Sequence, residues 1–299
     1  MRTLKTALNS VQANIKPIAL LSMLLLSPSK ALSNDCVDPS EACATVGEWE
    51  FQVAVGVGKR TNPLVDSDDI PLVVVPQVSY YGERFFLENL ELGYTLTESN
   101  HFMLNAILTP GRDSAYFLRE DINNFFVDGV LEFSNSIQPG DTPIDADTLD
   151  LDDLHKRRLA GLAGFELSSD WAGLQWQLQL LQDITRVHKG QEARFAAGFS
   201  SGSQTQRFSA SAGLTWKSDA IMNYYYGVSL KEAGPSPLAY EASSGFTSFA
   251  RLGWQKKLSP RWRLNASVQY EQLSQAMTDS PIVDENKVLQ FFIGGLYHF

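Results

Sequence analysis

An alternation of apolar and polar residues with a period of two constrains this chain more than any other feature. Residues 262–270 show it in full, with Trp262, Leu264, Ala266, Val268 and Tyr270 set between Arg263, Asn265, Ser267 and Gln269. The pattern recurs at residues 49–57 and 207–216, and more weakly at 72–81, 85–96, 101–108, 159–168, 174–183, 193–200, 246–255 and 288–299. Such alternation is typical of β-strands with two chemically different faces. The chain is therefore predicted to be all-β.

Alternation alone does not say whether the apolar face points to a core or to lipid. The segments are about ten residues long, the length that a tilted strand needs to cross a bilayer. The other face is small and polar, which suits a wet lumen. Five of the six tryptophans also lie near segment ends, as in an interfacial aromatic girdle, with core packing as the alternative: Trp49, Trp171, Trp216, Trp254 and Trp262.

The C-terminal residues favour a membrane-embedded barrel more strongly. The chain ends in FFIGGLYHF, so that Tyr297 and Phe299 lie on one face of the last segment. An aromatic last residue with a second aromatic two positions earlier resembles the terminal signal of Gram-negative outer-membrane proteins, which the barrel-insertion machinery reads. Tyr297 and Phe299 are therefore predicted to be a membrane-insertion signal. The predicted fold is an antiparallel transmembrane β-barrel of the bacterial outer membrane.

Residues 1–33 have the features of a secretory signal peptide. A basic start without acidic residues is followed by an apolar run at 17–26 and by the small residues Ala31 and Ser33. A transmembrane anchor is the alternative, but the run is shorter than the about 20 residues that a spanning helix needs. We predict cleavage after Ser33 and export across the inner membrane.

The two cysteines follow this cleavage point, in a predicted periplasmic tail at residues 34–46. Cys36 and Cys43 would meet an oxidising compartment, so a disulfide between them is predicted. Acylation of Cys36 is disfavoured because Ser33, Asn34 and Asp35 precede it. Residues 47–299 are predicted to form a single transmembrane β-barrel domain.

The strand count follows less directly from the pattern than the fold class. The alternating segments number eleven, and residues 221–228 could add a twelfth. Short turns are expected at 97–100, 168–171 and 258–261, and long connections at 59–71, 109–158, 217–244 and 274–287. Bacterial barrels have an even strand number and both termini in the periplasm. Counting from the two ends puts 109–158 on opposite sides, so a turn must be missing upstream, for example within 82–96. Twelve strands are predicted, with ten as the alternative.

No motif in the sequence carries recognisable chemistry. The net charge of −10 argues against a nucleic-acid partner, and no phosphate-binding, zinc-protease, C-x-x-C or G-x-S-x-G pattern is present. The acidic run at 145–153 lacks the glycine of a calcium loop, so it is read as a solvated loop with a short helix. We predict no catalytic, cofactor-binding or metal-binding residue, and therefore no enzyme and no cofactor.

The four histidines give no contrary signal. His188 follows Asp183 by five residues at a strand-to-loop junction, but one sequence cannot show a nucleophile converging on this pair. His298 alternates away from the lipid face and is expected to point into the lumen. His101 and His155, like the other two, are read as surface or turn residues.

Several loop motifs resemble the MipA/OmpV family of outer-membrane β-barrels. They are LLQDITRVHKG (180–190), NYYYGVS (223–229), AYEASSG (239–245) and DSPIV (279–283). We interpret residues 224–227, together with the Ser280-Pro281 turn, as an aromatic-rich outer loop. Gly227 is expected to permit an unusual backbone angle, and Pro281 with the preceding Ser280 is expected to mark a tight turn. The acidic insertion at 109–158 departs most from the family pattern.

The resemblance implies location and fold more firmly than activity. The family includes a scaffold that holds a murein transglycosylase and a penicillin-binding protein in peptidoglycan synthesis, so this role is the first expectation, with outer-membrane lipid as the surroundings. A narrow passive channel for small solutes or antibiotics is the alternative, since Arg207, Arg251 and Arg263 face Glu50 and Glu91 across a polar lumen. Inward Phe249 and Phe292 could plug it. A surface adhesin is a weaker alternative.

Overall fold

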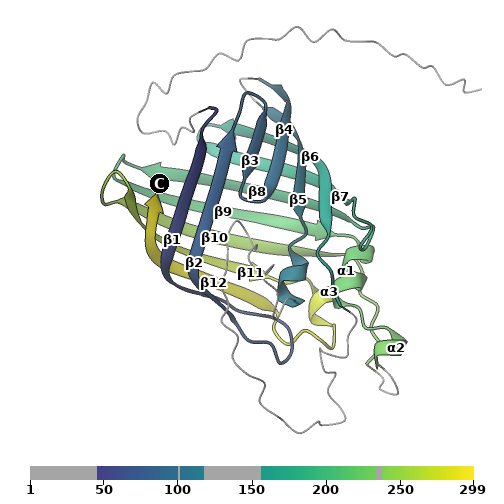
Figure 1. Cartoon of the computed structure of the whole chain (residues 1–299). Helices are drawn as coiled ribbons and strands as arrows, with labels where there is room; N and C mark the ends of the chain where they lie inside the picture. The colour runs from purple at the N-terminus through teal and green to yellow at the C-terminus, as the bar shows by residue number, and fades with distance from the viewer. Residues whose placement is uncertain (1–45, 100–101, 118–155, 234–237) are drawn as a thin grey trace, which may run out of the picture. The chain divides into compact units, whose positions relative to one another are not determined.

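The computed structural model describes residues 46–99, 102–117, 156–233 and 238–299. The chain divides into residues 1–35 and 36–299, and all described residues belong to the second unit. They form twelve antiparallel strands in a closed barrel, in which each strand pairs with its sequence neighbours and β12 closes on β1 (Figure 1). The strands are β1 (Trp49–Arg60), β2 (Ile70–Tyr81), β3 (Phe85–Glu88), β4 (Glu91–Glu98), β5 (Met103–Pro110), β6 (Gly161–Trp171), β7 (Leu174–Asp183), β8 (Gln191–Gly202), β9 (Gln206–Lys217), β10 (Gly245–Lys257), β11 (Trp262–Gln272) and β12 (Lys287–His298). The predicted fold class and the count of twelve are confirmed.

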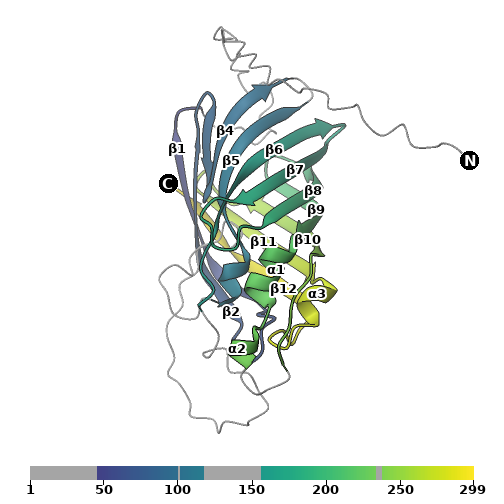
Figure 2. The same ribbon diagram turned by 90° about the vertical axis from the view of Figure 1, so that its right-hand side faces the viewer.

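The helices are short and lie in the connections between strands (Figure 2). They are the 3-10 helix η1 (Asp113–Phe117) and the α-helices α1 (Asp219–Tyr226), α2 (Leu230–Ala233) and α3 (Gln275–Thr278). Among the described residues, no helix has the length and apolar character to cross a bilayer.

The two ends of the barrel differ in the length of the connections that they carry. One end, here called the turn end, carries the start of β1, the end of β12 and five short turns: 82–84, 99–102, 172–173, 203–205 and 258–261. The other, the loop end, carries the long connections 61–69, 111–160, 184–190, 218–244 and 273–286. All four predicted long connections thus lie on one side. By the rule for bacterial barrels, the turn end is expected in the periplasm and the loop end outside the cell.

The missed turn lies within the suspected region. Residues 85–96, predicted as one strand, are two strands that reverse at Asn89 and Leu90. Asn89 adopts a left-handed backbone with φ of 53°, which asparagine tolerates better than most residues. Its N–H donates to the Val78 carbonyl at 2.7 Å, and its Oδ1 accepts from the Val78 N–H at 3.3 Å. Because this hairpin is short, residues 70–77 of β2 pair only with β1 among the described residues.

The suggested extra strand at 221–228 is wrong. Residues 219–226 form α1, and its buried side chains are Ile221, Met222, Tyr225 and Tyr226. This spacing of i, i+1, i+4 and i+5 is helical. The tyrosine run suggested a strand because aromatic residues favour β-structure, but tertiary packing of one helical face decides the outcome here.

The strands present their apolar face outward. In β1, Phe51, Val55 and Val57 are exposed, whereas Ala54 faces inward and is buried. Phe292 of β12 and Phe249 of β10 point inward as predicted: the first packs in a buried cluster with Ala54, and the second lines the lumen. An exposed apolar belt around a polar lumen is the arrangement of a membrane-spanning barrel.

Candidate functional site: the lumen and its loop-end cap

Among the residues that the structure describes, the largest buried apolar cluster lies at the loop end of the barrel. It joins Leu64 from the β1–β2 connection, Tyr116 from η1, Met222 and Tyr226 from α1, and Met277 from α3. Each of these side chains is at most 5% exposed. We call this cluster, with its supporting loops, the loop-end cap. Four connections that are distant in sequence therefore form one small core, which is unlike a set of independent solvated loops.

Backbone contacts lock the cap segments together. Val228 and Tyr240 exchange two N–H to carbonyl hydrogen bonds of 2.8 Å. The Ser280 hydroxyl donates to the Tyr226 carbonyl at 2.5 Å, and Leu64 and Val283 form an isolated bridge. Since buried backbone groups need partners, these bonds fix how the four connections meet.

Arg157 clasps the C-terminal end of α1. Its guanidinium donates to the carbonyls of Tyr225 at 3.3 Å and Gly227 at 2.8 Å, and to the Glu232 carboxylate at 3.2 Å. The side chain is almost fully buried. A cation at the C-terminus of a helix meets the negative end of its dipole and its unpaired carbonyls. Arg157 therefore ties the segment before β6 to α1.

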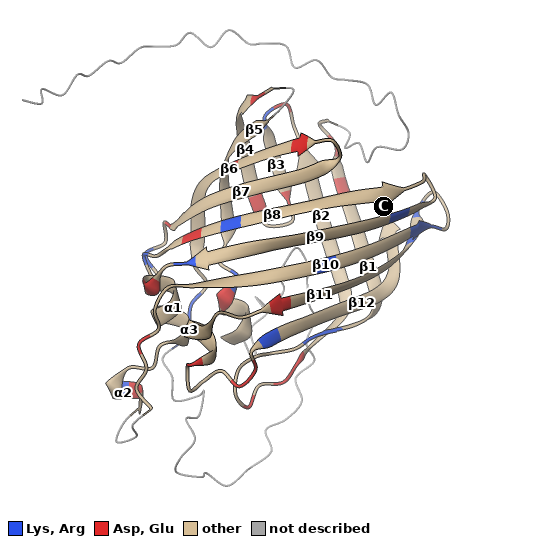
Figure 3. Cartoon of the chain, turned by 180° about the vertical axis from the view of Figure 1, so that it is seen from behind, with Lys and Arg blue, Asp and Glu red and all other residues tan. Residues whose placement is uncertain are grey.

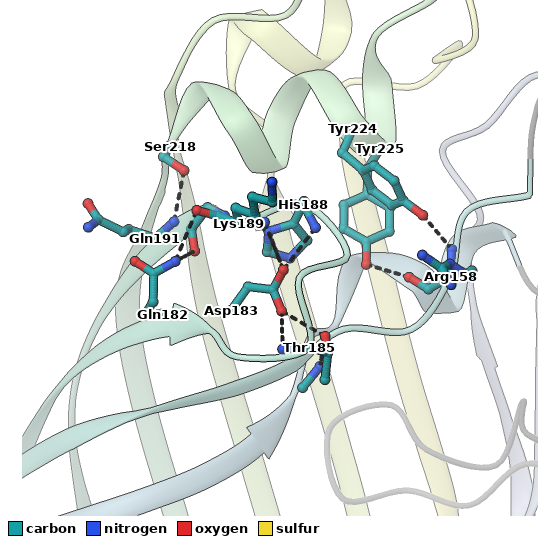
Figure 4. A network of polar contacts seen from close by, with 12 residues as sticks. Arg158, Gln182, Asp183, Thr185, His188, Lys189, Gln191, Ser218, Tyr224 and Tyr225 are labelled. Carbon is teal, nitrogen blue, oxygen red and sulfur yellow. Dashed lines mark hydrogen bonds and ion pairs between the residues drawn. The ribbon is translucent and has the colours of Figure 1, made fainter.

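Asp183, the last residue of β7, organises the connection to β8 (Figure 4). Its carboxylate accepts hydrogen bonds from the backbone N–H groups of Thr185, His188 and Lys189, each at 2.8 Å. It also accepts one from the Thr185 hydroxyl at 2.7 Å. Four donors on one carboxylate hold residues 184–190 in a single conformation.

His188 is buried against α1 rather than exposed. Its ring lies 6.0 Å from the Tyr224 ring and 5.8 Å from the Tyr225 ring, between centroids. Its Nδ1 lies 3.7 Å from Asp183 but accepts a hydrogen bond from the Gly190 N–H at 2.9 Å. That acceptor must be unprotonated, so the imidazole is neutral and the contact with Asp183 is not an ion pair. Burial lowers the pKa of His188, although nearby Asp183 acts in the opposite direction.

This geometry does not fit a hydrolytic triad. A triad carboxylate accepts from the Nδ1–H of its histidine, leaving Nε2 to act as base. Here Nδ1 is itself an acceptor, and the Asp183 oxygens are occupied by loop donors. In the described part of the chain, no group of three His, Cys, Asp or Glu side chains could hold a metal ion.

A buried ion pair links the cap to the lumen wall. The Lys217 ammonium of β9 and the Tyr226 hydroxyl both donate to Oδ1 of Asp113, each at 2.6 Å. Burial by itself would raise the pKa of Asp113, but the charge and the hydrogen bond of Lys217 outweigh it, and the Tyr226 hydroxyl adds to them, so that the pKa lies below its usual range. A second link joins Arg60 of β1 to the Tyr116 hydroxyl at 2.7 Å and to Glu271 of β11 at 3.7 Å.

Below the cap, polar side chains cross-link the inner wall. Glu166 accepts from the Asn105 amide at 3.0 Å and from the Gln179 amide at 2.8 Å. Gln179 also reaches Glu91 at 3.2 Å. Arg194 donates to Glu192 at 2.7 Å. Glu166 and Glu91 are thus held by neutral amides, and Arg194 is held by Glu192.

A cavity of about 700 Å³ occupies the lumen. It runs from Glu98 and Asp170 near the turn end to Asp113 and Tyr116 beneath the cap, and Arg251 lies on its wall. The Arg251 guanidinium donates to Gln269 at 2.6 Å. The predicted polar lumen therefore encloses room for a small solute or for water.

The predicted site residues lie at the strand ends. Trp49 begins β1, Trp171 ends β6, Trp262 begins β11, and all three are exposed at the turn end. Trp254 lies nearer that end of β10, and Trp216 lies at the loop end of β9. Tyr297 and Phe299 lie at the end of β12, with their rings 4.9 Å apart. The girdle and the insertion signal remain predictions. Cys36, Cys43, His101 and His155 lie outside the described residues, as does the acidic run at 145–153.

Two loop interpretations have different outcomes. The Ser280–Val283 turn around Pro281 is confirmed by the bond from the Val283 N–H to the Ser280 carbonyl at 3.1 Å. The prediction of an unusual backbone angle at Gly227 is wrong, because the φ of this residue is −72°. Glycine is needed there for space, since a Cβ would lie 2.2 Å from Oδ1 of Asn223 and 2.3 Å from its carbonyl oxygen.

Sequence reasoning missed Asp113, Lys217 and Arg157 as partners in the cap. Asp113 and Arg157 belong to the connection that departs most from the family pattern, and Lys217 lies opposite Asp113 only in the folded barrel. The one available signal was the set of loop motifs. Residues 180–190, 223–229, 239–245 and 279–283 all meet in or beside the cap.

The model of the family described as MltA-interacting protein MipA matches residues 53–299. The chain belongs to the MipA family. Among relatives, the putative outer membrane protein YiaT of Escherichia coli K12 is 23% identical, over 87% of this chain and 95% of the relative. The MltA-interacting protein of the same strain is 25% identical, over 84% and 91%. OmpV of Vibrio cholerae is 34% identical, over 29% and 34%.

Among solved structures, the NanC porin matches with 8% identity and a TM-score of 0.41, covering 84% of this chain and 99% of that chain. The relatives of this MipA-family chain are named as outer-membrane proteins. This chain is an outer-membrane β-barrel of MipA/OmpV type, and the resemblance seen in its loop motifs is confirmed.

Proposed function

We propose that this MipA-family barrel is a non-catalytic scaffold that anchors cell-wall enzymes to the outer membrane through its turn end. The observation that carries the proposal is the loop-end cap. Four connections pack into a core at the loop end of the barrel. The buried ion pair of Asp113 with Lys217 and the hydrogen bond from Arg60 to Tyr116 join that core to the wall. Such packing gives an anchor a rigid framework, which is the property that a scaffold requires.

The name of one relative supports the choice of partner. The MltA-interacting protein of Escherichia coli aligns over most of its length with this chain. We propose the equivalent murein transglycosylase, and with it a penicillin-binding protein, as partners in peptidoglycan synthesis. The turn end is the surface open to them, because it carries both ends of the barrel and is expected in the periplasm.

Affinity capture tests the scaffold. The full chain, tagged at a loop-end position such as exposed Lys231, is expressed in its own host and extracted in mild detergent after brief cross-linking. Mass spectrometry is expected to enrich a murein transglycosylase over a matched capture with an unrelated outer-membrane barrel. Equal recovery of murein enzymes by both baits would refute the scaffold.

A narrow channel is the second candidate, favoured by the lumen cavity of about 700 Å³ and its polar wall. It requires a path for the solute through or beside the cap. Liposome swelling in small sugars checks it: swelling comparable to that of a general porin at equal protein supports the channel, and none counts against it.

A further inference from the structure

One sector of the barrel wall carries positive charge without any negative charge. Residues 193–217 and 245–270, which cover most of β8, β9, β10 and β11, contain eight Lys and Arg residues and no Asp or Glu. The whole chain has 34 acidic against 24 basic residues, so this sector runs against the overall composition. Barrel folding alone does not require this charge distribution, which favours a binding role.

Five of these cations gather at the turn end of the sector (Figure 3). We call them the basic rim: Arg207, Lys256, Lys257, Arg261 and Arg263. All but Arg207 are exposed. Lys257 of β10 lies directly opposite Arg263 of β11 in the ladder. Like charges at directly opposed positions destabilise a sheet, so the pair is unfavourable for the barrel alone.

The rim points in two directions. Lys257 and Arg263 share the inward face with Arg251 and Gln269, since residues two apart in a strand lie on one face. Arg207 lies opposite Gln255 and shares that face. Lys256 lies on the outward face with Trp254. The basic rim therefore has cations on both faces of the wall at the mouth of the lumen, and is not confined to the membrane-facing surface.

This geometry distinguishes the anions that could bind. Lipid phosphates surround the whole barrel and lie nearest to outward cations such as Lys256, whereas Lys257 and Arg263 lie on the face that lines the lumen. A flexible acidic chain approaching along the barrel axis can contact both sets. We propose that the basic rim is a docking surface for an extended acidic segment of a periplasmic protein. The proposal rests on the scaffold function and specifies the chemistry of the partner.

Peptide binding tests the rim directly. The full chain in nanodiscs of zwitterionic phosphatidylcholine is titrated against a fluorescein-labelled deca-glutamate peptide and a neutral deca-glutamine peptide, with binding read by fluorescence anisotropy. The acidic peptide is expected to bind selectively and to weaken steeply as salt rises, because exposed charges are screened. The double variant K257E/R263E is expected to weaken binding at least about tenfold. Equal binding by this variant overturns the proposal.

A matched control places the same charge change at the loop end. The variant K231E/K287E alters two exposed lysines there and is expected to leave peptide affinity within about twofold. Heat-dependent gel mobility confirms that each variant is a folded barrel. Equal losses in both variants would mean a net-charge effect and would overturn the rim.

Two further outcomes separate peptide docking at the rim from lipid binding and from the scaffold function. If K257E/R263E loses phosphatidylglycerol in native mass spectrometry but keeps the peptide, the surface binds lipid and the proposal fails. Affinity capture separates the rim from the scaffold. If the peptide binds but no murein enzyme is captured, the scaffold function with those partners is contradicted and the basic rim stands as a docking surface. If the wild type and K257E/R263E capture those enzymes equally, the docking role of the basic rim is contradicted.

Discussion

Asp113 shows how one buried carboxylate can decide the stability of a loop structure. It receives Lys217 and Tyr226 on a single oxygen, and its side chain is almost fully buried. A buried pair of this kind stabilises little compared with an apolar substitute, but removing one partner leaves the other charge uncompensated. The residue is therefore far more sensitive to mutation than its position in a long connection suggests.

We expect Asp113→Asn to lower the free energy of unfolding by about 3 kcal/mol or more, because Lys217 would stay buried without a counter-charge. Urea unfolding in lipid vesicles, followed by tryptophan fluorescence, measures the change. Asp284→Asn, which alters an exposed carboxylate in another loop, is the control and is expected to change little. A loss below about 1 kcal/mol for Asp113→Asn would show that the pair is solvated.

His188 should make the cap sensitive to acid. Its pKa is lowered in the fold by burial, so the folded state binds a proton less readily than the unfolded chain, whose histidine has a pKa of about 6.5. The stability that depends on neutral His188 is thus full above that pH and is lost as pH falls towards the lowered value.

Amide hydrogen exchange over residues 184–190, followed from about pH 7.5 to 5 and corrected for intrinsic rates, checks this expectation. Faster local exchange at low pH is expected for the wild type. His188→Asn keeps an acceptor near the position of Nδ1 but does not titrate, so its corrected exchange should stay flat. Parallel profiles for the two proteins would assign the acid response to another group.

At the scale of elements, α1 is the piece around which the cap assembles. Its buried face meets α3 and η1, and its C-terminus is held by Arg157 and followed immediately by Gly227. The close approach of Gly227 to the carbonyl of Asn223 leaves no room for a side chain.

We therefore expect Gly227→Ala to destabilise the folded protein by about 1–3 kcal/mol, the usual cost of overpacking. Thermal melting in detergent measures the loss. Gly173→Ala is the control, because Gly173 has open space around it but a φ of 82°, so that its replacement strains the backbone without a steric clash. Amide hydrogen exchange locates the effect: in Gly227→Ala the lost protection should concentrate in residues 223–233 and 238–242, whereas Gly173→Ala should affect the turn end. Indistinguishable exchange patterns would contradict the steric account.

For the whole molecule, the cap predicts an electrically silent barrel. We expect the refolded protein in a planar bilayer to show no discrete conductance steps, because the loop end is packed. Replacing residues 219–242 by a short Gly-Ser linker removes α1 and should produce steps. Regular steps from the wild type would reverse the ranking and place the channel first.

The sequence allowed the barrel to be predicted almost completely, because a period of two with one apolar face is imposed by lipid on every strand. It failed where local pattern and tertiary packing disagree. The hairpin at Asn89 lies inside a continuous alternation, and the tyrosine run of α1 has strand-like composition. The cap could not be predicted at all, since Asp113 and Lys217 are 104 residues apart and only the closed barrel brings them together.

A closed barrel is a ring of hydrogen-bonded ladders, and a ring parts at its weakest link. The β9–β10 ladder runs from Gly245 to Lys256, whereas β2 and β3 pair only through Ser79–Tyr81 and Phe86–Glu88. Val78 turns its N–H and carbonyl towards β3, so Pro76, two residues earlier, lies on the same edge and has no N–H to leave unpaired. The junction between β2 and the short β3–β4 hairpin is thus the weakest ladder in the wall. Under heat or a pulling force, the barrel should open there first and become a curved sheet before any other strand is lost.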